Sequence, residues 1–308
     1  MLRFESIFWG TNNRDGLVQK LKSLGFDVKP SRRDPQSQSV FFGPEAMELV
    51  SINDKLVTLV DQGPREGVFA VGLESADIVS DYHRLQKLSD KAVGTPHGAK
   101  DATENIPLWF GFGLSPALTP GLLGWVVANS PAVLKRMSKE TLPASHPNTC
   151  FGIEGIHLYC ENPDTEGASW AKIAAKFSSG LQWSEGQKTQ GRRLQTGDRF
   201  FDLLKLPGSG FKPGVFMVTI RVTDLEFAKE ICTKAGANVE PCRSRDGFIV
   251  PGSFTGGPAL RFVRSAWKAY LPAVSENFPK GRRRDQFRPL GGADTSTLTT
   301  GFKDDWTY

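Results

Sequence analysis

The hydrophobic pattern of the chain repeats itself near the two ends. Residues 21–30 read LKSLGFDVKP and residues 232–241 read CTKAGANVEP. In each stretch, apolar positions at helical spacing lead to a glycine, and a short extended piece with a valine leads to a proline. Glycine is common just past the end of a helix because it adopts a positive φ at no steric cost. Both stretches therefore predict the same corner, where a helix ends and a strand begins.

The residues before each corner extend the repeat. Alternating apolar residues predict a strand at 2–9 and another at 215–222, since residues two apart on a strand share a face. A capping residue then opens an amphipathic helix. The cap is Asn12 or Asn13 in the first case and Asp224 in the second.

Two further stretches carry the same order of strand, cap and helix. One is GVFAVGLESADIVSDYHRLQKL, with Asp77 as the cap, and the other is GIEGIHLYCENPDTEGASWAKIAAKF, with Asn162 as the cap. β-like segments follow the helices, for example QSVFFG and AMELVSI after the first helix and GFIVPG and ALRFVR after the fourth. The repeating unit is therefore a strand, a helix and three strands (βαβββ).

The faces of these units predict how they pair. A single βαβββ unit leaves one face of its sheet bare, whereas two paired units close an incomplete barrel around a space suited to a small molecule. We predict an α+β fold of four βαβββ modules paired into two incomplete β-barrel domains. The expected domains are 1–130 and 150–265, with a linker at 131–149 and a C-terminal tail at 266–308.

Composition and charge narrow the function classes. The chain has 308 residues, of which 39% are apolar, and a net charge of only +5, so it can bury a core and carries no strong field. The basic run KGRRRDQFR at 280–288 is interpreted as a solvated segment, with a nuclear signal or an anionic partner as the alternative. The start lacks a leader pattern, and proline and glycine interrupt the apolar stretch at 106–129. We expect a cytoplasmic protein without nucleic-acid or membrane partners, as a monomer or a homodimer.

The organisation resembles the vicinal oxygen chelate superfamily, which includes glyoxalase I, extradiol dioxygenases and bleomycin-resistance proteins. The stretch at 152–177 is the nearest match to the strand, cap and helix of that family. HPNTCFGIEG at 146–155 is similar to the glyoxalase-like subgroup, in which a His-Pro-Asn stretch commonly precedes the third unit. The resemblance covers about residues 1–265 and implies a small-molecule protein built from four βαβββ units.

The resemblance also implies where a metal would bind. In the metal-using members, one ligand lies on the first strand, seven residues before the helix cap and usually His, and another lies on the last strand, usually Glu. Counting back from the four caps gives these first-strand positions: Ser6, Ala70, Gly155 and Met217. None of them is a His. The last strands offer Glu48, Asp202 and Arg261, and the second unit offers only PLWFGFGL in no fixed register.

These residues do not make a metal site. A divalent metal needs three or more convergent nitrogen or oxygen ligands, and Arg261 would place a cation where the metal belongs. We therefore predict no metal and no other cofactor. A register slip by one residue would turn every side chain to the other face, and an Fe, Zn, Mn or Ni site would then become possible.

The second barrel carries the candidate chemistry. Strand alternation predicts that six polar side chains point inward: His157, Tyr159, Asp202, Thr219, Arg221 and Arg261. His157, Asp202 and Tyr159 are the catalytic candidates, with His157 as a base that Asp202 orients. Arg221, Arg261 and Thr219 are candidates for binding a carboxylate or stabilising an enolate, and Gly155 would leave room for the ligand. In the alternative, His157 and Tyr159 only fill the barrel, and Arg221 and Asp202 form a structural ion pair.

The first barrel is expected to be more apolar. Its predicted lining is Phe4, Ser6, Phe8, Ala46, Glu48, Val50, Ala70, Gly72 and Glu74. Glu48 is a further candidate for substrate binding, as a general base or a remnant of a metal site, and the alternative is a solvated rim residue. The aromatic lining would suit a flat apolar ligand, although such residues more often fill a core.

These observations favour one function over two others. The leading hypothesis is a metabolic enzyme of the vicinal oxygen chelate fold, which carries out an acid–base lyase, isomerase or hydrolase step on a carbonyl- or carboxylate-bearing compound without the usual metal. The first alternative is a non-catalytic protein that binds and sequesters an aromatic compound. The second is a metal-dependent enzyme of the glyoxalase or dioxygenase type.

Overall fold

The computed structural model describes most of the chain between its second residue and residue 265. The described ranges are 2–31, 37–43, 45–53, 65–100, 107–130, 146–174, 176–183, 189–196, 199–205, 213–242 and 246–265. Most of the expected linker, 131–145, and the whole expected tail, 266–308, lie outside the described residues.

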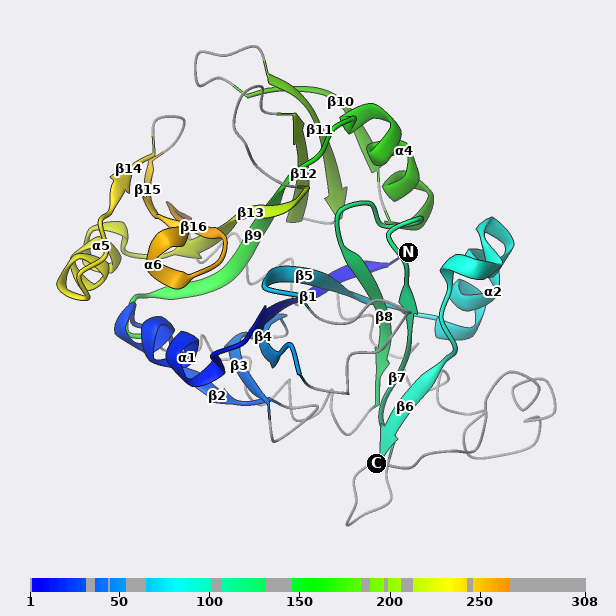
Figure 1. The fold of residues 1–308 in the computed structure, drawn as a ribbon, viewed down its shortest axis with the longest axis horizontal. Helices are drawn as coiled ribbons and strands as arrows, with labels where there is room; N and C mark the ends of the chain where they lie inside the picture. Colours follow the sequence, from blue (N-terminus) through cyan, green and yellow to red (C-terminus); the bar gives the residue numbers. More distant parts are fainter. Residues whose placement is uncertain are drawn as a thin grey trace.

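Two mixed sheets form the body of the molecule (Figure 1). The first sheet has the order β2-β3-β4-β1-β5-β8-β7-β6 and the second has the order β10-β11-β12-β9-β13-β16-β15-β14. The first sheet is built from β1 (Arg3–Thr11), β2 (Val28–Pro30), β3 (Gln38–Phe42), β4 (Glu45–Ser51), β5 (Gly67–Glu74), β6 (His97–Lys100), β7 (Pro107–Leu114) and β8 (Leu123–Asn129). The second is built from β9 (Cys150–Tyr159), β10 (Lys176–Trp183), β11 (Thr189–Thr196), β12 (Arg199–Lys205), β13 (Gly214–Val222), β14 (Glu240–Pro241), β15 (Gly247–Val250) and β16 (Ala259–Arg264).

Strand pairing confirms the α+β fold of four βαβββ units. In each unit the first strand pairs in parallel with the last, as in β1 with β4 and β13 with β16. The first strands of two consecutive units pair antiparallel, as β1 with β5 and β9 with β13. One assignment was wrong: PLWFGFGL forms β7, the third strand of the second unit, and β8 is the last.

Four longer helices in the described ranges complete the units. They are α1 (Arg14–Ser23), α2 (Ile78–Leu88), α4 (Pro163–Ala174) and α5 (Leu225–Lys234). Two single turns are η2 (Asp90–Ala92), between α2 and β6, and α6 (Gly252–Thr255), between β15 and β16. Each predicted cap is confirmed, with Asn13 rather than Asn12 in the first unit. The caps Asn13, Asp77, Asn162 and Asp224 accept hydrogen bonds from the backbone N–H groups of Gly16, Ser80, Thr165 and Phe227, respectively.

The two similar corners have the same geometry. Gly25 and Gly236 both have a φ of 82°, the left-handed conformation that favours glycine. The residue after each glycine donates its N–H back to the last turn of the helix, from Phe26 to the Leu21 carbonyl (3.0 Å) and from Ala237 to the Cys232 carbonyl (3.1 Å). The predicted end of both helices is therefore confirmed.

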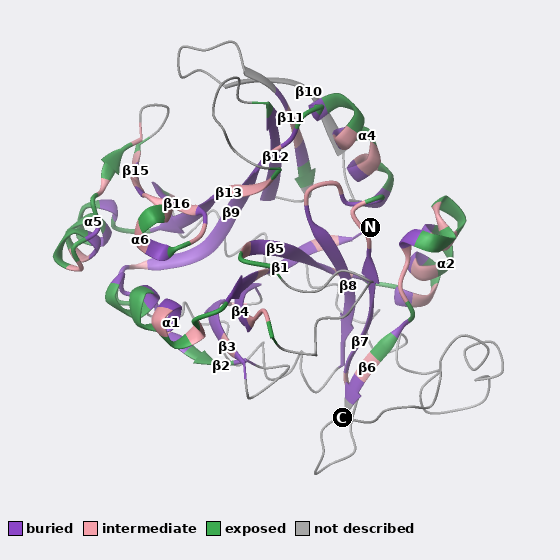
Figure 2. Cartoon of the chain, in the orientation of Figure 1, coloured by how far each residue is buried: buried purple, intermediate pink, exposed green. Residues whose placement is uncertain are grey.

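One continuous core holds the two sheets together. In Figure 2 the strands are mostly buried, and each helix turns an exposed side outward. Phe4 of β1 packs on Phe201 of β12, with 5.9 Å between the ring centroids, and Phe26 packs near Phe262 of β16, at 6.0 Å. These pairs cross from one sheet to the other, so the core belongs to both half-barrels.

Polar groups also cross between the sheets. The Nδ1 atom of His146 accepts a hydrogen bond from the Asp27 N–H (2.9 Å), and its Nε2 atom lies 2.8 Å from the Phe41 carbonyl oxygen, so Nε2 carries the proton. The side-chain amide of Asn148 donates to the Leu24 carbonyl (2.9 Å). The His-Pro-Asn stretch therefore holds the start of the second half-barrel against the first corner.

A buried ion pair and a helix contact make further connections. Arg199 of β12 donates through Nε to Glu45 of β4 (2.6 Å), and both side chains are buried. Arg84 of α2 donates to the carbonyl groups of Lys172 (3.0 Å) and Ile173 (3.2 Å) in the last turn of α4.

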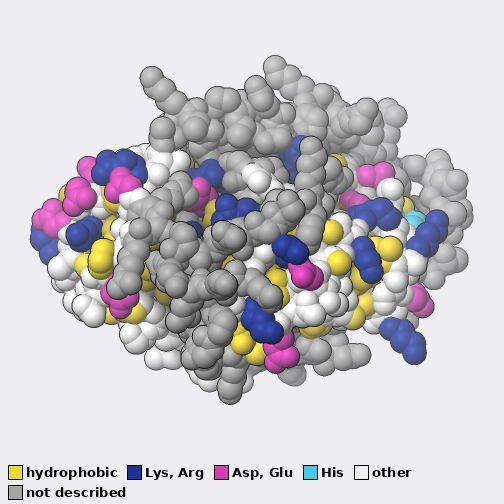
Figure 3. Space-filling view, turned by 90° about the horizontal axis from the view of Figure 1, so that it is seen from above, with side chains coloured by type: hydrophobic (Ala, Val, Ile, Leu, Met, Phe, Trp, Pro, Cys, Tyr) yellow, Lys and Arg dark blue, Asp and Glu magenta, His cyan; other side chains and the backbone are white. Residues whose placement is uncertain are grey.

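Figure 3 shows acidic and basic side chains interspersed on the face seen from above. No helix in the described ranges is both long enough and apolar enough to cross a lipid bilayer.

Candidate functional site

The central strands of the second sheet bring four predicted side chains together. His157 lies on β9, Asp202 on β12, Thr219 on β13 and Arg261 on β16. Asp202 is opposite His157 in the pairing of β12 with β9, and Thr219 is opposite Arg261 in the pairing of β13 with β16. We call these four residues, together with Arg193, the His157 centre.

Hydrogen bonds determine which nitrogen of His157 carries the proton. The Nε2 atom lies 3.0 Å from Nη2 of Arg261 and 2.8 Å from Oγ1 of Thr219, and the Nδ1 atom lies 3.1 Å from Oδ2 of Asp202. A guanidinium is always protonated and can only donate. The Nε2 atom must therefore be the acceptor, and the proton of the neutral ring lies on Nδ1, facing Asp202.

The hydroxyl group of Thr219 fits the same assignment. Arg261 donates through Nε to Oγ1 of Thr219 (3.0 Å). Because that contact uses the oxygen as an acceptor, the hydroxyl hydrogen is available for Nε2 of His157. Arg261 thus contacts both the imidazole and the hydroxyl group, and it holds the lone pair of His157 in a fixed direction.

The surroundings keep His157 neutral. His157, Asp202 and Thr219 are 0% exposed. Burial lowers the pKa of His157; the hydrogen bond and charge of Asp202 raise it in part, and the charges of Arg261 and Arg193 lower it further. Burial by itself would raise the pKa of Asp202, but Arg193 and His157 outweigh that effect and hold the pKa below its usual value.

Arg193 of β11 completes the centre and was missed in the sequence. It forms a two-pronged ion pair with Asp202, with 2.7 Å between Nε and Oδ1 and 2.9 Å between Nη2 and Oδ2. Its Cζ atom lies 3.9 Å from the centroid of the Phe200 ring. Arg193 is directly opposite Asp202 in the pairing of β11 with β12, so recognising 189–196 as a strand would have revealed it.

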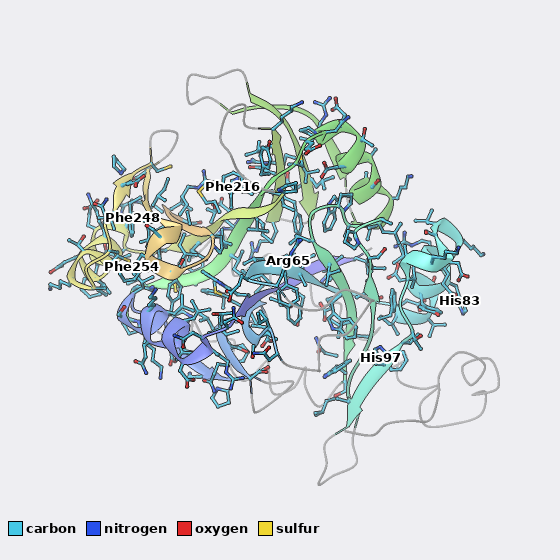
Figure 4. All side chains as sticks on the ribbon, viewed as in Figure 1. Arg65, His83, His97, Phe216, Phe248 and Phe254 are labelled. Atoms are coloured by element: carbon cyan, nitrogen blue, oxygen red, sulfur yellow. The ribbon has the colours of Figure 1, made fainter. Side chains whose placement is uncertain are left out.

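The expected room beside Gly155 is filled. A Cβ atom added to Gly155 would lie 2.3 Å from the ring of Phe200. That ring also packs edge-on against His157, with 5.4 Å between centroids, and Phe216 lies 6.1 Å from His157; the latter is labelled in Figure 4. The prediction that Gly155 leaves space for a ligand was therefore wrong, because an aromatic side chain from β12 occupies the space.

Three predicted site residues lie outside the His157 centre: Tyr159, Arg221 and Glu48. Tyr159 ends β9, opposite Gly214. Arg221 lies 4.0 Å from Glu154. The described ion pair of Asp202 is with Arg193, in place of the alternative pairing with Arg221.

The remaining candidate, Glu48, belongs to the first sheet. It accepts a hydrogen bond from the hydroxyl group of Ser39, the residue opposite it on β3. It is 5% exposed, so the alternative of a solvated rim residue was wrong. The other histidines labelled in Figure 4, His83 and His97, lie on α2 and β6, away from Phe216.

A bulge in β1 changes the predicted lining of the first half-barrel. The pairing of β1 with β5 shifts between Phe4 and Ser6. Glu5 and Ser6 therefore share a face, and the Ser6 hydroxyl group donates to the Glu5 carboxylate (2.8 Å). Phe4 turns instead into the core between the sheets, so its prediction as a lining residue was wrong.

The His157 centre does not fit the metal that the fold resemblance implies. His157 and Asp202 are its only donors of the usual ligand types, and the guanidinium of Arg261 lies against the Nε2 atom that would face a metal. A fixed cation at that atom repels a second one. Within the described ranges, no three His, Cys, Asp or Glu side chains gather as a metal site would require.

Comparison with known proteins identifies the architecture. No protein-family profile and no curated protein sequence matches the chain. Among solved structures, the chain is similar to 2,2',3-trihydroxybiphenyl 1,2-dioxygenase from Sphingomonas wittichii strain RW1, with a TM-score of 0.57 and 14% identity over 86% of this chain and 90% of that chain. It is also similar to a mutant of 4-hydroxymandelate synthase from Streptomyces coelicolor, with a TM-score of 0.54 and 13% identity over 92% of this chain and 100% of that chain.

A third neighbour is a hypothetical protein from Staphylococcus aureus, with a TM-score of 0.57 and 12% identity over 86% of this chain and 100% of that chain. At identities this low, the structural similarity establishes the fold alone. The likeness to the glyoxalase-like subgroup stays a prediction. With four βαβββ units paired through their first strands, the chain has the fold of the vicinal oxygen chelate superfamily.

Proposed function

We propose that the protein is a small-molecule enzyme that uses the His157 centre for metal-independent acid–base chemistry. The observation that carries the proposal is the neutral ring of His157, with its proton directed at Asp202 and its lone pair on Nε2. A neutral imidazole oriented by a carboxylate is the usual form of a general base. The proposed reaction class is an isomerase or lyase step that begins with removal of a proton beside a carbonyl group.

Each group of the centre has a role in that step. Nε2 of His157 takes the proton from the carbon beside the carbonyl, and the electron pair of the broken C–H bond moves onto the carbonyl oxygen. Arg261 stabilises the resulting enolate, as a fixed cation does where negative charge develops. In an isomerisation of a conjugated or 2-hydroxy carbonyl compound, the imidazolium returns its proton to another carbon of the enolate or enediol. In an elimination, the electron pair returns from the oxygen and forms a C=C bond to the next carbon, and the group that leaves this carbon takes the proton from the imidazolium.

Arg261 also explains how a buried base becomes available. In the structure its guanidinium contacts Nε2 of His157, which has no exposed surface. A carbonyl-bearing anion makes a stronger, charge-assisted bond with a guanidinium than a neutral imidazole does. Binding of such a substrate draws Arg261 away from Nε2 and leaves the lone pair free for the proton.

A second candidate function is binding without turnover. The observation that favours it is the complete burial of His157, Asp202 and Thr219, because a fully bonded polar network can serve structure alone. In that case the centre stabilises the half-barrel and no proton is transferred to a ligand.

Exchange of substrate hydrogen in deuterated water separates the two candidates. Phenylpyruvate and 2-oxobutyrate both carry an acidic C–H bond beside a carbonyl group and a carboxylate, and NMR follows deuterium entering that carbon. We expect the wild-type protein to accelerate exchange of at least one of them and His157→Gln to reduce the rate about 10²- to 10⁴-fold, the usual contribution of a general base. His83→Gln, which alters a histidine on α2, is the matched control and should exchange like the wild type.

The remaining outcomes decide between the candidates. Binding of these compounds without exchange would support the second candidate and contradict the first. Equal exchange by the wild-type protein and His157→Gln would remove His157 from the mechanism.

A further inference from the structure

A group of unpartnered polar atoms lies on the other half-barrel. Trp109 of β7 and Asn129 of β8 are directly opposite each other in an antiparallel pair, so their side chains leave the same face of the sheet. They are 8% and 4% exposed. The Nε1 atom of Trp109 and both polar atoms of the Asn129 amide have no hydrogen-bond partner among the described residues. We call these two residues and Trp125 the Trp109 cluster.

Unpartnered polar groups are costly inside a protein. Each buried donor or acceptor left without a hydrogen bond costs about 1–3 kcal/mol, and native structures contain few of them. Three such atoms on two facing residues form a pattern: one indole donor, one amide donor and one amide acceptor. A bound molecule with the matching groups would satisfy all three at once.

The surroundings favour a flat molecule. Trp109 and Trp125 pack edge to face, with 5.3 Å between centroids and 80° between the planes. Ala99 and Val127 belong to the same apolar cluster, and Phe8 packs against it. A Cβ atom at Gly111 would come within 2.8 Å of the Trp125 ring, so that ring lies directly against the backbone of β7.

The charges on this sheet disfavour an anion. The carboxyl groups of Glu5 and Glu48 lie on the same sheet, where they accept hydrogen bonds from the hydroxyl groups of Ser6 and Ser39. The second sheet has the opposite character, with Arg193 and Arg261 at its centre. The negative charge of the Glu5 and Glu48 carboxyl groups favours a neutral ligand over an anion in the first half-barrel.

We infer that the first half-barrel holds a second small-molecule site, built on Trp109 and Asn129, for a neutral planar aromatic compound with an amide-like edge. The ring system packs on Trp125. A carbonyl oxygen accepts from Nε1 of Trp109 or from the Asn129 amide, and a ring N–H donates to Oδ1 of Asn129. The site does not depend on the acid–base chemistry proposed for His157.

Three compounds of similar shape test the inference on the full-length protein. They are 2-quinolone, which is neutral with a lactam edge; quinoline-2-carboxylate, which is anionic; and naphthalene, which has no polar edge. Quenching of tryptophan fluorescence and isothermal titration calorimetry measure the binding. We expect 2-quinolone to bind at least 10-fold more tightly than either of the others.

Variants assign the binding to these residues. Trp109→Phe and Asn129→Leu should each weaken 2-quinolone about 10-fold, the effect of one lost hydrogen bond of about 1.4 kcal/mol. Two controls should bind like the wild type: Asn53→Leu, an exposed asparagine, and His157→Gln, in the other half-barrel. Equal binding of the three compounds, no binding of 2-quinolone, or unchanged binding in both variants would overturn the inference.

Thermal unfolding provides a test that needs no ligand. Asn129→Leu replaces an unpartnered amide with an apolar group of similar size, so the melting temperature should stay the same or rise. A large drop in the melting temperature of Asn129→Leu would mean that the amide has a partner within the protein, and it would contradict the site.

Discussion

The two half-barrels have the same strand order and pairing, but their inward-facing side chains differ. The strands of the two sheets pair in equivalent registers, so each position in the first sheet has an equivalent in the second. The equivalent positions are Phe8 and His157, Glu48 and Asp202, Ser39 and Arg193, Gly72 and Thr219, and Trp125 and Arg261. A carboxylate occupies the same place in both sheets. Its neighbours are a hydroxyl group and a phenyl ring in the first, and an arginine and a histidine in the second.

This difference shows how one fold provides two kinds of environment. A bulge occurs at equivalent points of β1 and β9, at Glu5 and Glu154. The backbone therefore directs equivalent side chains inward in both sheets. What changes is the described partner of the carboxylate, which is the Ser39 hydroxyl group in the first sheet and Arg193 and His157 in the second. The second sheet builds a network of bonded charges, and the first leaves the polar atoms of Trp109 and Asn129 without described partners.

The largest expected contrast comes from the two carboxylates. Asp202→Asn removes the charge between Arg193 and His157, and breaking a buried pair from one side costs about 3–5 kcal/mol. Glu48→Gln keeps an acceptor for Ser39 and should cost about 1 kcal/mol. Urea unfolding measures both free energies. Equal losses in the two variants would contradict the view that Asp202 depends on charged partners more strongly than Glu48 does.

A smaller contrast concerns the space beside the bulge. Gly155 faces Phe200 in the second sheet, whereas the equivalent pair in the first sheet is Ser6 and Ala46. Gly155→Ala should cost about 1–3 kcal/mol of unfolding free energy, because its Cβ atom would overlap the Phe200 ring. Adding Phe200→Leu should cancel part of that loss in a double-mutant cycle. Simple addition of the two effects would show that the ring does not limit the site.

A further expected effect is the dependence of stability on pH. Burial lowers the pKa of both His146 and His157. A group whose folded pKa lies below its unfolded value of about 6.5 adds stability above that pH, and the stability is lost as the pH falls. Each such histidine should lower the unfolding free energy by up to about 1.4 kcal/mol per pH unit below pH 6.5.

Variants of the two histidines check that slope. Urea unfolding of His146→Gln and His157→Gln should show a shallower decline than the wild type between about pH 6.5 and pH 5. Phe8, the equivalent of His157 in the first sheet, does not titrate and contributes nothing to the slope. A wild-type stability that is flat over this range would contradict the neutral state of the two rings.

Local signals in the sequence predicted the units well. Caps such as Asp77 and corners such as Gly25 depend on a few neighbouring residues, so they could be identified without knowledge of the fold. The inward direction of His157 and Asp202 followed from strand alternation, because both lie on regular stretches of β9 and β12.

Features that depend on contacts between distant strands could not be predicted. The bulge at Glu5 turned Phe4 away from the expected face, and it arises from the pairing with β5. Phe200, which fills the space at Gly155, lies 45 residues later in the sequence, on another strand. No local pattern reveals a contact between residues so far apart. Arg193 lies on a polar strand with little apolar alternation. His146 could be identified only as part of the His-Pro-Asn stretch, and its contacts with Asp27 and Phe41 could not be predicted.

The protonation state of His157 tests the account most directly. Nitrogen-15 NMR of the histidine rings distinguishes a neutral ring with its proton on Nδ1 from one with its proton on Nε2 and from the charged imidazolium. At pH 7 we predict the neutral ring with the proton on Nδ1, because Arg261 can only donate to Nε2. An imidazolium, or a proton found on Nε2, would contradict the arrangement of Asp202, His157 and Arg261 on which the proposed function rests.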